Sequence, residues 1–193
     1  LGIIIGVASV IIMVNLGSSA TAQVAQQIAN LGSNLLMVRT GQRLGFGQRS
    51  AAESFDLDDV EAIGRDVGGV AAVAPVASQS MIAIYGNRNW STTATGTDNN
   101  YLAVGNWTLA SGREFSDSEL RAGAAVCIIG DTVRKELFGS LDALGEKMRL
   151  NKLSCQIIGV LAPKGQSVGG RDQDDLVLTP LRTFWRRVAG NQD

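Results

Sequence analysis

The chain opens with an apolar, uncharged stretch, and the rest of the sequence has the mixed polarity of a water-exposed protein. Residues 1–16 read LGIIIGVASVIIMVNL. At a rise of about 1.5 Å per residue, a helix of this length would cover roughly 24 Å, just short of the bilayer core. The stretch therefore predicts the outer part of a transmembrane helix. A buried core helix and the apolar part of a signal peptide are the alternatives.

The helical pattern continues beyond the apolar stretch. Apolar residues recur at steps of three and four: Leu16, Ala20, Val24, Ile28 and Leu31. This spacing puts them on one face of a helix, with glutamines on the opposite face. Residues 17–33 are therefore predicted to form a stiff stalk helix that transmits a displacement from one compartment to the other.

Small residues within the apolar stretch suggest a contact between membrane helices. Gly2 and Gly6 form a GxxxG pair, and Ser9 lies near them on the same helix. Small residues at this spacing allow two membrane helices to approach closely. The alternative is chance, because glycine is common in membrane helices.

The segments that follow predict an α+β domain. A helix is expected over residues 55–67 with Asp56 as its cap, and a capping box at Ser116 and Glu119 predicts a short helix near 117–121. Another helix is expected over 132–138, capped by Asp131. Short apolar or alternating runs predict strands at residues 34–40, 70–76, 80–85, 90–97, 124–129, 147–150, 153–161 and 176–179.

Composition excludes several classes of functional site. The chain has no histidine, which excludes histidine-based triads and histidine-ligated zinc. The formal net charge is -1, and the only basic cluster, at Arg182, Arg186 and Arg187, is typical of a solvated face. Nucleic acid is therefore not expected as a partner. No phosphate-binding loop or nucleophile elbow is present, so the chain is predicted not to be an enzyme and to bind no cofactor.

Two further groups of residues offer possible chemistry. Cys127 and Cys155 stand in apolar runs, and we expect both to be buried and reduced; a disulfide is the alternative in an oxidising compartment. Asp172, Asp174 and Asp175 form an acidic loop. Their spacing is not that of a calcium loop, so a metal site is not predicted there.

Several segments together resemble one family of membrane proteins. The opening stretch is similar to the first transmembrane helix of MacB-type ABC transporter permeases. The resemblance continues in order along the chain through NLLMVR at 34–39, VAPV at 73–76, GREFSDSEL at 112–120, IIGDTVRKELFG at 128–139, LGEKMRL at 144–150, IIGVLAPKG at 157–165 and DDLVLTPL at 174–181. These segments cover most of the chain.

The resemblance implies a fold and a set of domains. Such permeases have four transmembrane helices, with a large periplasmic domain between the first two. Residues 34–97 would form the first half of a porter-like subdomain with a βαβ unit, and residues 98–178 an inserted, sabre-like mixed α/β subdomain. Residues 179–193 would return toward the porter-like subdomain, whose second half would follow.

The resemblance also implies a mechanism and partners. A separate nucleotide-binding domain would bind ATP, and the stalk would pass its movement to the periplasmic domain by mechanotransmission. Expected partners are the inner membrane, the ABC ATPase, a second permease copy, a periplasmic adaptor of the MacA type and an outer-membrane duct of the TolC type. Residues after about 17 would lie in the periplasm. A lipoprotein-releasing permease of the LolC/LolE kind and an FtsX-like module that activates a cell-wall hydrolase are the alternatives.

Overall fold

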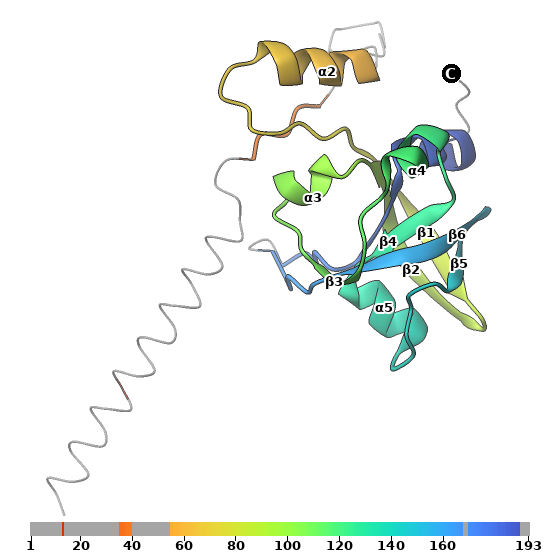
Figure 1. Cartoon of the computed structure of the whole chain (residues 1–193). Coiled ribbons are helices and arrows are strands. Elements are labelled where there is room, and N and C mark those ends of the chain that lie inside the picture. The colour runs from red at the N-terminus through yellow and green to blue at the C-terminus, as the bar shows by residue number, and fades with distance from the viewer. Residues whose placement is uncertain (1–12, 14–34, 40–54, 168–169, 190–193) are drawn as a thin grey trace, which may run out of the picture. The chain divides into compact units, whose positions relative to one another are not determined.

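The computed structural model describes residues 13, 35–39, 55–167 and 170–189 (Figure 1). The chain divides into two compact units, residues 1–36 and 37–193, and every helix and strand named below belongs to the second. Within the described part, no helix combines the length and the apolar character that crossing a bilayer requires.

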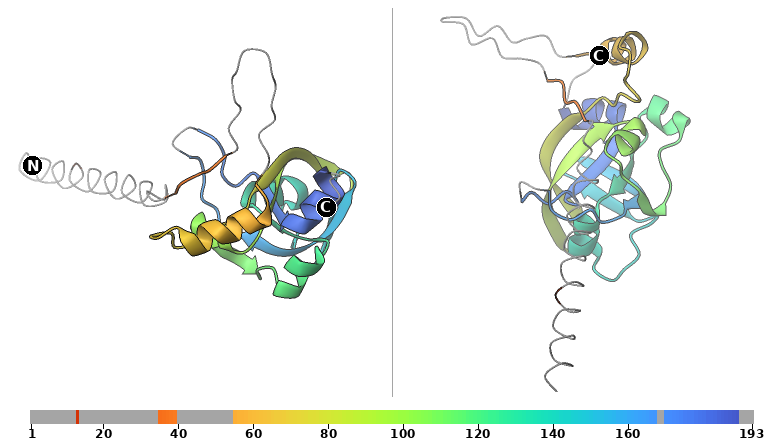
Figure 2. Two further views of the ribbon diagram at one scale, coloured as in Figure 1. Left: turned by 90° about the horizontal axis from the view of Figure 1, so that it is seen from above. Right: turned by 90° about the vertical axis from the view of Figure 1, so that its left-hand side faces the viewer.

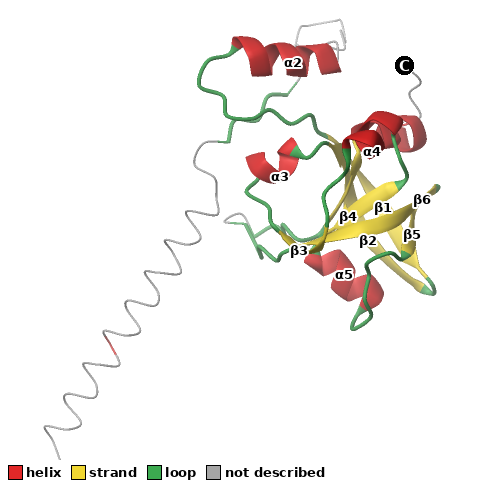
Figure 3. Cartoon of the chain, viewed as in Figure 1, coloured by secondary structure: helices red, strands yellow, loops and turns green. Residues whose placement is uncertain are grey.

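The second unit is built on one mixed sheet of seven strands. Its strands are β1 (Ala77–Tyr85), β2 (Arg88–Thr97), β3 (Leu109–Gly112), β4 (Val126–Ile129), β5 (Lys147–Leu150), β6 (Leu153–Leu161) and β7 (Leu176–Pro180), in the order β3-β6-β4-β7-β2-β1-β5. Since β5 also pairs with β6, the strands β6, β4, β7, β2, β1 and β5 close into a ring (Figure 3). The β2–β7 and β4–β6 pairs are parallel, and the other pairs are antiparallel.

The main core is formed by alternate side chains of the ring strands. Its fully buried members include Ala83, Ala94, Ile129, Leu150 and Ile157, one from each of five strands. This alternation is what a strand with one buried face requires.

Two helices complete this main core. Helix α5 (Asp131–Phe138) contributes Val133, Leu137 and Phe138, and the Phe138 ring lies 4.1 Å from the Tyr85 ring between centroids. Helix α6 (Leu181–Phe184) contributes Phe184, and the π-helical turn η1 (Trp185–Ala189) follows it. Figures 1 and 2 show α5 at one end of the ring and α4 with the C-terminal helices at the other.

A second, smaller core lies against other side chains of β4, β6 and β7. It joins Ile128, Leu161 and Leu178 to Leu102 of α3 (Asn100–Val104) and to Phe115, which precedes α4 (Asp117–Ala122). The chain between β2 and β4 is therefore packed onto the sheet by apolar side chains.

The predicted N-terminal helix of this unit is confirmed as α2 (Leu57–Asp66). Asp56 accepts a hydrogen bond from the Asp59 backbone at 2.9 Å, and the Asp59 carboxylate accepts one from the Asp56 backbone at 3.0 Å. The capping box at Ser116 and Glu119 is likewise confirmed at the start of α4. Both helices begin where the sequence pattern puts them, because a cap is a local interaction.

Two strand predictions are wrong. Residues 35–39, from the predicted strand 34–40, and residues 70–76 form no ladder with any strand that the structure describes. In the second segment the carbonyl oxygens of Val73 and Pro75 instead accept hydrogen bonds from the side chains of Asn100 and Thr97. An apolar extended run becomes a strand only when a neighbouring strand supplies its hydrogen bonds.

The predicted cap of α5 is also wrong. Asp131 is the first residue of the helix, and Gly130 occupies the cap position. The Asp131 carboxylate instead forms ion pairs with Arg134 at 2.9 Å and Lys135 at 2.7 Å. A cap side chain at position 130 would collide with the backbone of Asp174, so glycine takes that place.

The expected division of the chain at residues 97 and 98 stays a prediction. The sheet itself runs across this point, since β2 pairs with β7 and β1 pairs with β5. Strands from both expected parts thus share one ring.

Candidate functional site

A disulfide links two neighbouring strands of the ring within the main core. It joins Cys127 of β4 to Cys155 of β6, whose Cα atoms are 5.9 Å apart. The prediction that both cysteines are buried is confirmed, and the prediction that they are reduced is wrong. The parallel pairing of Val126 with Gln156 brings the two side chains together, and spacing along the chain could not reveal that pairing.

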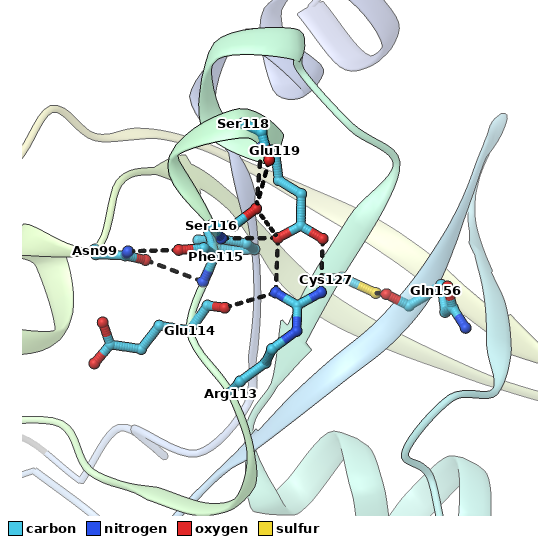
Figure 4. Close-up of polar contacts among 9 residues, drawn as sticks. All are labelled: Asn99, Arg113, Glu114, Phe115, Ser116, Ser118, Glu119, Cys127 and Gln156. Atoms are coloured by element: carbon cyan, nitrogen blue, oxygen red, sulfur yellow. Dashed lines mark hydrogen bonds and ion pairs between the residues drawn. The ribbon is translucent and has the colours of Figure 1, made fainter.

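The disulfide is enclosed by the main core. Cys127 is 0% exposed and Cys155 is 1% exposed, and the Cys127 sulfur lies 3.6 Å from the backbone oxygen of Gln156 (Figure 4). A reductant therefore has no direct path to the bond while the domain is folded. The bond acts as a fixed link between two strands that belong to different parts of the chain.

The three carboxylates of the acidic loop accept hydrogen bonds from other parts of the chain. The two Asp174 oxygens accept hydrogen bonds from the backbone N–H groups of Lys164 and Gly165, each at 2.8 Å. Asp172 accepts one from the Thr132 hydroxyl at 2.7 Å, and Asp175 accepts one from the Trp90 indole at 3.0 Å. The three carboxylates are thus used separately, and the described residues contain no metal-binding cluster.

Lys164 ties this loop to the segment after α3. Its ammonium lies 4.2 Å from the centre of the Trp107 ring and donates a hydrogen bond to the backbone oxygen of Gly105. Burial lowers the pKa of Lys164, and the nearby Asp174 carboxylate opposes that shift. Lys164 has a structural role, because its ammonium already contacts the face of the Trp107 ring and the backbone oxygen of Gly105.

A network of charged and amide side chains fixes the chain before α4 (Figure 4). Arg113 donates two hydrogen bonds of 2.7 Å to Glu119 in a paired arrangement. Asn99 both donates to and accepts from the backbone of Phe115, at 2.8 and 3.2 Å. These contacts position Phe115 so that its ring enters the second core.

The network gives a testable pH dependence. Hydrogen bonds from Arg113 lower the pKa of Glu119 to about 2, whereas the pKa of an unfolded glutamate is about 4.3. Because the folded pKa is the lower one, the stabilisation is complete above the unfolded pKa and is lost as the pH falls toward 2. We expect Glu119→Gln to flatten the stability profile between about pH 4.5 and 2, as measured by urea unfolding at each pH.

The matching control is Glu136→Gln, since Glu136 forms no ion pair among the described residues. That variant is expected to keep the wild-type profile in this range. Equal flattening by both substitutions would mean that the Arg113 pair contributes nothing specific.

One open pocket brings four segments together. Leu57 of α2, Asp98 at the end of β2, Leu120 of α4 and Arg182 of α6 line it, together with Pro75, Thr97 and Leu181. Burial raises the pKa of Asp98, although nearby backbone N–H groups partly oppose the shift. The pocket is shallow and mostly apolar, and it carries no arrangement of groups that would perform a reaction.

The site residues predicted from the sequence lie outside the described part of the structure. These are the membrane-packing residues Gly2, Gly6 and Ser9 and the stalk residues Leu16, Ala20, Val24, Ile28 and Leu31. They stay predictions.

The comparison with protein families decides the identity of the chain. The model of the MacB-like periplasmic core domain matches residues 1–193, which is the whole chain. The chain belongs to this family. It is therefore a MacB-like periplasmic domain of an ABC transporter permease, as the resemblance of its motifs implied.

Curated relatives agree. The chain is 40% identical over 192 residues to the macrolide export ATP-binding/permease protein MacB of Azoarcus sp. (strain BH72), and covers 29% of that protein. It is 37% identical to the MacB protein of Wolinella succinogenes and covers 30% of it. The chain thus spans less than a third of the length of these relatives, and all of it, or nearly all, aligns with them.

Solved structures support the fold. The periplasmic region of MacB from Actinobacillus actinomycetemcomitans superposes with a TM-score of 0.66 at 23% identity, over 86% of this chain and 73% of that one. The extracellular domain of the ABC-type transporter YknZ from Gram-positive bacteria gives 0.60 at 24% identity, over 72% and 68%. The MacB-like domain therefore has the mixed α/β fold of these domains.

Proposed function

We propose that this MacB-like domain couples ATP hydrolysis in the cytoplasm to the export of a substrate from the periplasm. In this proposal the stalk of residues 17–33 passes movement of the membrane helices to the domain, which drives the substrate outward. The chain supplies no catalytic residue for this step, and ATP is bound by a separate domain. The match to the MacB-like periplasmic core domain over residues 1–193 supports the assignment.

The observation that carries the mechanical part is the closed and cross-linked ring. A displacement applied to one side of a domain reaches the other side only if the domain does not deform. Here the strands close on themselves, α5 and α6 pack against the core, and the Cys127–Cys155 bond links β4 to β6. Close-packed interiors have low compressibility, so such a domain moves as one body.

The disulfide also fits the proposed location. Disulfides persist in the bacterial periplasm and are rare in the reducing cytosol. We place residues after about 17 in the periplasm, on a protein of the inner membrane. The proposed partners are the ATPase domain, a second permease copy, an adaptor of the MacA type and an outer-membrane duct of the TolC type.

Exposed apolar side chains mark a surface that we expect another part of the longer permease to cover. Phe55, Val67, Val70 and Val76 are 44%, 49%, 40% and 56% exposed. They flank α2 in the segment expected to be half of the porter-like subdomain. Exposed large apolar side chains of this kind are expected where another part of the permease packs.

The test of the proposed function is to loosen the stalk in the full-length transporter. Val24→Gly with Ile28→Gly would place at each position a residue that is about 1 kcal/mol less favourable in a helix than alanine. We expect export to fall while ATP hydrolysis survives, because the ATPase domain would continue to hydrolyse ATP without moving the periplasmic domain. Export of a labelled substrate and ATPase activity would be measured on the same membranes.

The control is Val24→Ala with Ile28→Ala, which removes the same apolar surface and keeps a strong helix former. It should export more than the glycine variant. Loss of hydrolysis and export together in a folded protein would contradict one-way transmission. Unchanged export would mean that residues 20–31 are only a tether.

A further inference from the structure

The ring closes through β5 at one half of strand β1 and leaves the other half with a free edge (Figure 1). β2 pairs with β1 over its whole length, whereas β5 pairs with the opposite edge only at Ala83 and Ile84. Asn151 extends this contact by one residue. Its backbone N–H donates to the Ile82 oxygen at 3.0 Å, and its side-chain oxygen accepts from the Ile82 N–H at 3.2 Å. Residues 77–81 have no strand on that side within the described part of the chain.

The free edge presents the backbone hydrogen-bonding groups of two serines. Along an antiparallel strand, the N–H and C=O groups of successive residues point alternately to opposite edges. Because those of Ile82 point away from β2, those of Ser80 and Ser78 point the same way. These groups have no hydrogen-bond partner among the described residues, and both serines are exposed. We call residues 77–81 the open edge.

The open edge lacks the features that keep an edge strand from pairing. Proteins blunt such strands with charges, prolines, bulges or short length. β3, at the other end of the strand order, is four residues long, has a bulge between Leu109 and Ser111, and is followed by Arg113 and Glu114. β1 is nine residues long, pairs with β2 in unbroken register, and has neither charge nor proline from residue 76 to 85. An edge of this kind fits an added strand.

The absence of charge also indicates which strand fits. When two copies of one strand pair antiparallel across a two-fold axis, the central residue meets its own counterpart. A charged residue there would face a like charge, which destabilises the pair. The neutral run from Val76 to Ile82 meets this condition. A strand from a different protein would impose no such condition, and charges beside the edge would commonly select it.

We propose that the open edges of two copies pair antiparallel across a two-fold axis centred on Gln79. Ser78 then lies opposite Ser80 of the second copy, and Gln79 lies opposite Gln79. This register uses the free N–H and C=O groups of both serines in each copy. A shift of two residues would lose part of these bonds, and toward the hairpin it would meet Ile82, whose backbone groups Asn151 already binds.

This proposal rests on the second permease copy in the proposed function and adds where the two periplasmic domains touch. A pairing of so few residues gives little affinity between free domains. Two domains that the membrane part already holds together meet at a high effective concentration, so a short pairing suffices there. The contact would therefore align the two copies rather than assemble them.

Cysteine cross-linking in the full-length permease tests the contact. Gln79→Cys would place two thiols in a pair without backbone hydrogen bonds, where Cα atoms lie about 4.5 Å apart, within the range of a disulfide. We expect mild oxidation to give a covalent dimer that is absent without the added cysteine. Ser91→Cys is the matched control and should give no dimer. Ser91 is exposed on the same hairpin, but it lies on β2, one strand away from the open edge.

Removal of one backbone donor supplies the decisive comparison. Ser80→Pro, added to Gln79→Cys, removes an N–H that points away from β2, and proline is tolerated at such edge positions. It should lower the yield of covalent dimer about tenfold, whereas Ser80→Ala should leave the yield unchanged. A yield that ignores Ser80→Pro, or that equals the Ser91→Cys control, would overturn the proposal. Thermal unfolding of the proline and alanine variants checks that both are folded.

A charge test of the register needs no proline. Two differently tagged versions would be co-expressed, one with Ser78→Cys and the other with Ser80→Cys, and treated with a short bismaleimide. We expect an adduct that carries both tags. Gln79→Lys in both versions should lower its yield about tenfold, and Gln79→Lys in one with Gln79→Glu in the other should restore it. An adduct that ignores the two like charges would contradict the pairing.

Hydrogen exchange over residues 77–82 of the full-length permease distinguishes other occupants of the open edge. Slow exchange at Ser78 and Ser80 together with the covalent dimer supports the proposal. Slow exchange without the dimer would assign the edge to a different strand, from the permease or from another protein. Fast exchange would mean that the edge stays unpaired. Either of these last two results would overturn the proposal.

ATP-driven export, measured on the same samples before oxidation, separates the two proposals. Normal export without the covalent dimer contradicts the interface and leaves the proposed function standing. A covalent dimer formed by a protein that exports nothing contradicts the proposed function and leaves the interface standing.

Discussion

Replacing Gly130 by alanine is expected to destabilise the domain by about 3 kcal/mol or more. A Cβ at this position would lie 2.8 Å from the carbonyl carbon of Asp174 and closer still to its oxygen. Gly130 also donates its N–H to Leu176 at 2.9 Å, so neither segment can move away without breaking the junction of β4, α5 and β7. The collision is with backbone, which cannot rotate aside as a side chain would.

The cost is large because the backbone of Asp174 is held from several sides. Its carboxylate holds the N–H groups of Lys164 and Gly165, and its own N–H donates to Asp172 at 2.9 Å. A displaced Asp174 would leave buried polar groups unpaired. Thermal unfolding should show a melting temperature lower by roughly 10 °C.

Gly68→Ala is the matched control. A Cβ at Gly68 meets nothing within 4 Å, and its backbone lies outside the left-handed region. That variant is expected to stay within about 0.5 kcal/mol of the wild type. Similar losses for Gly68→Ala and Gly130→Ala would show that the close approach at Asp174 does not limit stability.

The second large effect is expected from removing the disulfide. Cys127 and Cys155 are 28 residues apart in sequence, and a cross-link that closes a loop of this length stabilises a fold by about 3–4 kcal/mol through the unfolded state. We expect Cys127→Ala with Cys155→Ala to lower the free energy of unfolding by about that amount. Urea unfolding monitored by tryptophan fluorescence would measure it.

The wild-type chain unfolded under reductant is the control, because it loses the bond and keeps both side chains. Its transition should lie close to that of the double variant. Thiol labelling of the denatured, unreduced chain should be negligible. Full labelling there, or coincident oxidised and reduced transitions, would show that the bond does not form.

Local signals in the sequence predicted much of this fold. The strands at 147–150 and 153–161 coincide with β5 and β6, and the predicted cap at Asp56 and capping box at Ser116 mark true helix starts. In each case the deciding contacts are close along the chain. Alternation of buried and exposed residues sufficed for β5, and the turn after it follows from the left-handed backbone of Asn151.

The predictions that failed concern residues whose partners lie far along the chain. The apolar run at 70–76 looks like a strand, but its carbonyls bind side chains of Thr97 and Asn100. The cysteines look like two independent core residues until β4 and β6 are known to be parallel neighbours. Strand β3 was missed because four residues around Ala110 and Ser111 carry no clear periodicity. The apolar character of a residue indicates burial, but it does not indicate which residues will surround it.

The closed ring imposes an order on the folding of the domain. The β1–β2 hairpin can form early, since only a tight turn separates its strands. The other edge of β2 pairs later, because Ala94 pairs with Val177 and cannot do so until β7 has reached the same compartment. Pairings so distant in sequence make folding slow. Until β7 is in place, the chain would therefore expose an incomplete sheet with unpaired strand edges.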